Sequence, residues 1–159
     1  MHKSVYLAVA TSLLTATLAL ADAGHDHAAM SKNLKFGQPG KESEVTRTIN
    51  VSANDQMRFV LDAQRIKVGE TIKFVVKNEG KIVHEFTFGD AAYQRAHFAM
   101  MKKDPDMKHE DPNAVTLQPG ESKTLIWKFD KVMQGPLEIS CFTPGHYEQV
   151  MKALIGVTK

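Results

Sequence analysis

The chain has 159 residues, which is enough for one domain with a buried core. Its 20 lysines and arginines nearly balance 18 acidic residues, and no basic run indicates nucleic-acid binding. One cysteine cannot form a disulfide within the chain, so a disulfide-stapled scaffold is excluded.

Residues 1–21 have the pattern of a secretory signal peptide. A short positive start precedes an uncharged apolar run over 5–20, and Ala19-Leu20-Ala21 fits the small-x-small cleavage rule. We expect cleavage near Ala21 or Ala23. The apolar run is shorter than the roughly 20 residues of a spanning helix, so we expect no membrane insertion after cleavage. Export implies an oxidising compartment, where a metal bond would protect the one thiol.

Residues 22–44 show neither helix nor strand period, and we expect a flexible N-terminal arm. The arm contains His25, His27 and Met30, whose imidazole and thioether groups suit Cu(II) and Cu(I) respectively. This short cluster is either a weak additional copper site or an ordinary polar terminus.

From Val45 onward the sequence alternates apolar and polar residues with the period of a β-strand. About eight short runs are separated by turn residues, a pattern typical of a sandwich or barrel. The expected strands lie near 48–51, 57–61, 66–68, 71–77, 83–88, 124–129, 137–141 and 153–157. We therefore expect an all-β domain over 45–159 in which two antiparallel sheets share a core.

Residues 90–113 do not follow this alternation, and we expect them to form a short, Met-rich helical insertion. Asp90 is a suitable cap for a helix starting at Ala91. The favoured interpretation is a helix that covers one end of the sandwich, with methionines as packing. The alternative is a further copper site, since five soft or borderline ligands lie close together. These ligands are His97, Met100, Met101, Met107 and His109.

The segment 141–151 carries the most specific chemistry of the chain. Cys141 is followed by His146 and Met151, each after a four-residue spacer, and Thr143-Pro144-Gly145 lets the chain turn back. Strand alternation places Cys141 on the inward face. Thiolate, imidazole and thioether together suit copper, and two histidines, one cysteine and a weak axial methionine make a blue-copper site. The alternative is that Cys141 is a small buried hydrophobe.

His84 is the best candidate for the missing histidine. It shares one face of its expected strand with Phe86 and Phe88, so it points inward. The alternative is a core histidine bonded to the backbone. The loop 141–151 supplies only one of the two imidazoles of a blue-copper site, and this favours the interpretation of His84 as a metal ligand.

With His84, Cys141, His146 and Met151, residues 45–159 resemble the cupredoxin family of type 1 copper proteins, closest to the periplasmic copper-tolerance cupredoxins of bacteria. The resemblance implies a Greek-key β-sandwich, a periplasmic location and one type 1 copper centre that cycles between Cu(I) and Cu(II). Many small cupredoxins carry Asn directly after the first histidine, where this chain has Glu85.

Four protein ligands leave no open position for a substrate, so we expect no enzyme. The resemblance implies copper tolerance or homeostasis, with copper ions as the partner. The alternative is a soluble electron carrier of the azurin or plastocyanin kind, which needs a redox partner protein. A third option is copper delivery to a cuproenzyme.

Overall fold

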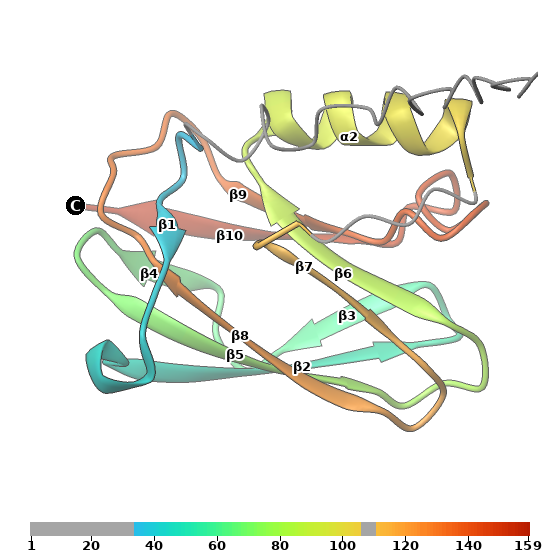
Figure 1. Ribbon diagram of the computed structural model, residues 1–159, viewed down its shortest axis with the longest axis horizontal. Coiled ribbons are helices and arrows are strands. Elements are labelled where there is room, and N and C mark those ends of the chain that lie inside the picture. Colours follow the sequence, from blue (N-terminus) through green and yellow to red (C-terminus); the bar gives the residue numbers. More distant parts are fainter. Residues whose placement is uncertain (1–33, 106–110) are drawn as a thin grey trace, which may run out of the picture.

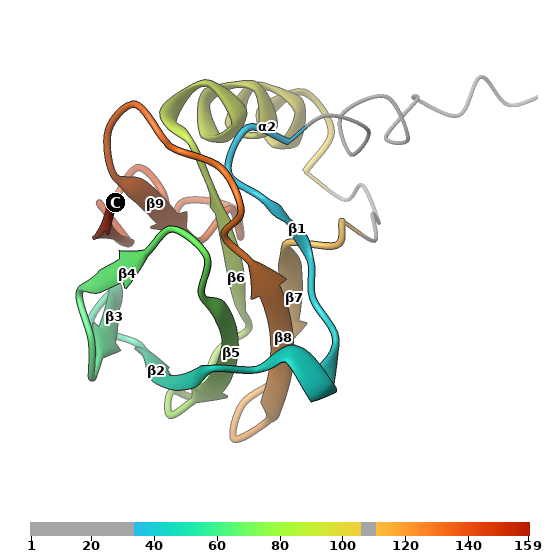
Figure 2. The same ribbon diagram turned by 90° about the vertical axis from the view of Figure 1, so that its left-hand side faces the viewer.

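Alternating apolar residues build two five-stranded β-sheets that share one core (Figures 1 and 2). The computed structural model describes residues 34–105 and 111–159. The first sheet has the order β1-β8-β5-β2-β3. Its strands are β1 (Gln38–Pro39), β8 (Ser122–Lys128), β5 (Thr71–Asn78), β2 (Arg47–Asn54) and β3 (Arg58–Leu61). A 3-10 helix, η1 (Glu42–Glu44), lies between β1 and β2.

The second sheet has the order β4-β10-β9-β6-β7. Its strands are β4 (Arg65–Lys67), β10 (Lys152–Thr158), β9 (Leu137–Ser140), β6 (His84–Gly89) and β7 (Ala114–Leu117). Both segments with candidate ligands adjoin this sheet, since His84 opens β6 and Cys141 follows β9. β6 and β9 are hydrogen-bonded neighbours, which brings the two segments side by side.

The all-β sandwich with a short helix is confirmed, but two details of the prediction are wrong. Pairing is not wholly antiparallel, because β2 pairs with β5 and β10 with β4 in parallel. The described residues form ten strands rather than about eight, because β1 has only two residues and the sequence Ala-Val-Thr-Leu of β7 does not alternate strictly between apolar and polar.

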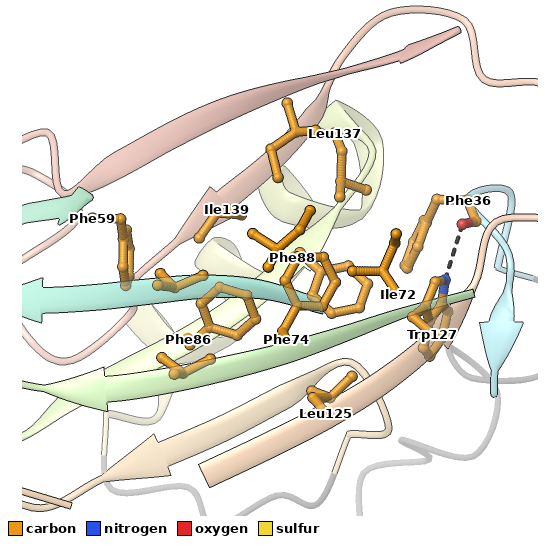
Figure 3. Close-up of a cluster of buried hydrophobic side chains, with 14 of the residues drawn as sticks. Phe36, Phe59, Ile72, Phe74, Phe86, Phe88, Leu125, Trp127, Leu137 and Ile139 are labelled. Atoms are coloured by element: carbon orange, nitrogen blue, oxygen red, sulfur yellow. Dashed lines mark hydrogen bonds between the residues drawn. The ribbon is translucent and has the colours of Figure 1, made fainter. Parts of the chain in front are cut away.

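The core between the sheets is dominated by aromatic side chains (Figure 3). Phe74 from the first sheet packs on Phe86 and Phe88 from the second, with ring centroids 5.5 and 5.3 Å apart. These three side chains are fully buried. Because His84 shares their face of β6, its side chain lies on the core side of the second sheet.

The expectation of a flexible arm over residues 22–44 is wrong for residues 34–44. Phe36 is buried and stacks on Trp127, whose Nε1 donates to Phe36 O at 3.0 Å (Figure 3). Gly37 follows with φ +119°, and a Cβ there would lie 2.1 Å from Lys128 O. The segment is too short to be recognised as a strand, and its position depends on a tryptophan far along the chain. Residues 22–33 lie outside the described residues.

Helix α2 (Ala91–Lys103) lies against the outer face of the second sheet, over β6 and β9 (Figure 1). Asp90 caps it as expected, since its Oδ1 accepts from Tyr93 N at 2.8 Å. Gln94 Nε2 donates to the carbonyls of Thr87 and Glu138, which fixes the helix to both strands. Every residue of β6 is therefore buried, including the polar Glu85 and Thr87 on its outer face. No helix within 34–105 or 111–159 is long and apolar enough to cross a membrane.

Candidate metal centre

The turn before β6 positions His84, the first residue of that strand. Asn78 fixes this turn, because its Nδ2 donates to Ile82 O and Leu117 O while its Oδ1 accepts from Gly80 N. His84 then enters the sheet paired with Leu117 of β7, and its side chain is fully buried.

The loop after β9 folds back on itself, so that its two ends meet. His146 N donates to Thr143 O, and Gly145 adopts φ +83°, as the Thr-Pro-Gly turn predicted. Met151 N donates to His146 O, and Cys141 N donates to Met151 O at 3.1 Å. This closure holds Cys141, His146 and Met151 in one compact unit, and all three side chains are buried.

The structure brings His84, Cys141 and His146 together. One potential ligand atom from each lies within 4.8 Å of the other two. Cys141 Sγ is 3.3 Å from His146 Nδ1, and the two imidazole centroids are 5.0 Å apart. Met151 is fully buried in the adjoining core.

The donor set fits a copper ion. His84 Nδ1 is buried without a hydrogen-bond partner among the described residues, which is costly unless the nitrogen binds something else. The neighbouring sulfur and imidazole groups are ligands that copper prefers over hard cations. A metal bond would satisfy the buried Nδ1.

Burial sets the protonation of the cluster. It raises the pKa of the Cys141 thiol, and it is also the main cause that lowers the pKa of His146. Without metal, the pocket therefore favours a neutral thiol and a neutral imidazole. A metal ion must displace the thiol proton to bind.

Glu85 connects the two ligand-bearing segments. Its backbone N donates to Cys141 Sγ at 3.3 Å, and its Oε2 accepts from Phe142 N at 3.3 Å. Thr87 Oγ1 donates to its other oxygen at 2.8 Å. A carboxylate thus joins the two segments at the position where many small cupredoxins have an asparagine.

His97 reaches this carboxylate from helix α2. Its Nε2 lies 3.8 Å from Glu85 Oε1, and its Nδ1 lies 3.5 Å from Asp111 Oδ2. The imidazole is fully buried and packs on Phe142, with ring centroids 4.9 Å apart. Both ring nitrogens of His97 therefore face carboxylates beside the ligand loop.

Among the described residues, His97 is not part of the cluster of His84, Cys141 and His146. Met100 and Met101 lie partly exposed on α2. Met107 and His109 lie outside the described residues, as do His25, His27 and Met30. The further copper sites stay predictions.

Two acidic residues that lie near the cluster were not predicted from the sequence. Asp55 contacts His84, with 3.4 Å between Oδ1 and Nε2, and Asp111 contacts His97. Asp55 belongs to the turn between β2 and β3, where an aspartate looks like any turn residue. Lys81 N donates to the Asp55 carboxylate, which chiefly holds its pKa below the usual value.

Comparison with known proteins agrees with the site. No protein-family model matches the chain. It is 40% identical to the copper-resistant cuproprotein CopI of Rubrivivax gelatinosus, over 91% of this chain and 90% of that protein. It is 36% identical to CopI of Pseudomonas aeruginosa, over 77% of this chain and 82% of that protein.

Solved structures show the same fold. Reduced auracyanin from Roseiflexus castenholzii superposes with a TM-score of 0.55 at 19% identity, over 72% of this chain and 98% of auracyanin. An azurin from Methylomonas sp. strain J gives 0.55 at 14% identity, over 72% of this chain and all of the azurin. Fold and site together define a cupredoxin. Within that class, the chain belongs to the CopI family of copper-resistant cuproproteins.

Proposed function

We propose that the chain is a periplasmic copper-binding protein that contributes to copper tolerance through one redox-active type 1 centre. His84, Cys141, His146 and Met151 would hold the ion. The observation that carries the proposal is the buried cluster of two imidazoles and one thiol, in a chain related to CopI proteins. Bound copper supplies a one-electron couple between Cu(I) and Cu(II).

The chain's own residues prepare the site. The loop closure between Cys141 and Met151 holds the two candidate sulfur ligands next to each other in the chain fold. Glu85 N donates to the cysteine sulfur and so stabilises negative charge on a thiolate. The aromatic rings of Phe142 and Tyr147 in the loop pack with Phe98 of helix α2.

A copper titration tests the proposal. Cu(II) added to the isolated protein is expected to give an intense thiolate-to-copper band that saturates at one equivalent. Cys141→Ser should lose the band, because oxygen replaces the thiolate. Wild-type protein without the band, or a Cys141→Ser variant that keeps it, would contradict the type 1 assignment.

Growth distinguishes copper tolerance from electron transfer alone. Cells that lack the protein are expected to stop growing at lower copper concentrations, and the wild-type gene should restore growth while the Cys141→Ser gene should not. Unchanged copper tolerance, with loss of electron flow to a redox partner, would favour the carrier function instead.

A further inference from the structure

The turn between β2 and β3 places the carboxylate of Asp55 next to His84, the first histidine of the candidate copper centre. Asp55 lies just beyond the end of β2 in the first sheet, whereas His84 opens β6 in the second. Their Oδ1 and Nε2 atoms are 3.4 Å apart. The contact therefore joins the two sheets at the end of the sandwich where the ligands lie.

The Asp55 carboxylate is held firmly on its other side. Lys81 N donates to both oxygens, at 3.0 Å to Oδ1 and 2.8 Å to Oδ2. The carboxylate also lies against Gly80, where a Cβ would come within 1.9 Å of Oδ1. Any larger residue at position 80 would displace it, so the turn before His84 is shaped around Asp55.

This contact selects one form of the His84 ring. A carboxylate at Nε2 favours the tautomer with a proton on Nε2. Nδ1 then carries the lone pair, and Nδ1 is the buried nitrogen without a hydrogen-bond partner among the described residues. A histidine that binds metal through one nitrogen and donates to a carboxylate through the other is oriented and made more basic.

We infer that Asp55 is a positioning residue that fixes the His84 ring and strengthens its donation to copper, favouring Cu(II) over Cu(I). The inference rests on the proposed copper function. A negative charge behind the ligand stabilises the more highly charged ion, so it lowers the reduction potential of the centre.

Asp55→Asn tests the charge while keeping an oxygen acceptor of similar shape. In copper-loaded protein we expect about tenfold weaker Cu(II) binding relative to Cu(I), which corresponds to a rise of about 59 mV in the one-electron reduction potential. Asp62→Asn is the matched control, because Asp62 follows β3 of the same hairpin and bonds to Asn50. It should leave the potential unchanged. Equal potentials in Asp55→Asn and wild type, or equal rises in both variants, would overturn the inference.

A measurement on copper-free wild-type protein tests the same contact without a variant. Nitrogen-15 NMR of the imidazoles is expected to show His84 protonated at Nε2, and a proton mainly on Nδ1 would overturn the inference. This result does not depend on the copper band. Failure of the proposed function, seen as a missing band in wild type, is thereby distinguished from failure of the role of Asp55.

Discussion

Glu85 places a buried carboxylate between two ligand-bearing segments, and each of its oxygens accepts a hydrogen bond. Phe142 N donates to one oxygen and Thr87 Oγ1 to the other. Buried donors that lose their acceptor are costly, so this residue contributes to stability as well as to the site. His97 adds a second connection, from helix α2 to the same carboxylate.

Glu85→Ala is expected to lower the free energy of unfolding of the copper-free protein by about 1–3 kcal/mol, since two buried donors lose their acceptor. Glu85→Gln keeps one oxygen acceptor and should cost less. Urea unfolding of both variants measures the difference. Equal stability of Glu85→Ala and wild type would show that these hydrogen bonds contribute little.

Copper binding should depend on pH through Cys141. Burial raises the pKa of this thiol, so at and below neutral pH the metal must release its proton. The release of the thiol proton alone is expected to raise the apparent Cu(II) affinity about tenfold per pH unit. The lowered pKa of His146 keeps that ring neutral near pH 7, so His146 releases no proton there when copper binds. Competition titrations between pH 5.5 and 7.5, a range chosen around the usual histidine pKa of about 6.5, measure the slope. A flat profile would contradict thiolate ligation.

At the scale of elements, the segment before β2 belongs to the core rather than to an arm. Phe36 contacts Trp127, Phe88 and Tyr93, and so connects both sheets to helix α2. Phe36→Ala is expected to lower the free energy of unfolding by about 3–5 kcal/mol, since it opens a cavity in the core. Phe36→Leu should cost less. Urea unfolding measures both, and a loss well below 1 kcal/mol for Phe36→Ala would restore the arm interpretation.

Helix α2 depends on its N-terminal cap. Asp90→Ala removes the acceptor for Tyr93 N and should cost about 1 kcal/mol, whereas Asp90→Ser should retain most of the stability. Thermal unfolding of the copper-free variants measures this. If Asp90→Ser is destabilised as much as Asp90→Ala, the cap is not the cause.

At the scale of the whole molecule, copper would join parts of the chain that are far apart in sequence. His84 belongs to the start of β6, whereas Cys141 and His146 belong to the loop between β9 and β10. An ion that binds only the folded state stabilises it by mass action, by about 2.7 kcal/mol at a free concentration 100 times the dissociation constant. The melting temperature should therefore rise with copper and fall again with a chelator. Cys141→Ser should show little of this rise, and an equal rise in that variant would place the stabilising copper elsewhere.

The sequence by itself determined the sandwich and the candidate ligands. Period-two alternation indicates which side chains face inward. The spacing of Cys141, His146 and Met151 indicates that one short loop carries three candidate copper ligands. Both are short-range properties of the chain. His84 could be selected because its strand showed the same alternation.

Only the tertiary structure decided the surroundings of those residues. The contact of Asp55 with His84, the carboxylates around His97 and the burial of Phe36 all join segments distant in sequence. The covering of the outer face of β6 by α2 likewise buries Glu85, which the local pattern places on a polar face. Such contacts depend on how sheets and helix pack, and local periodicity carries no information about packing partners.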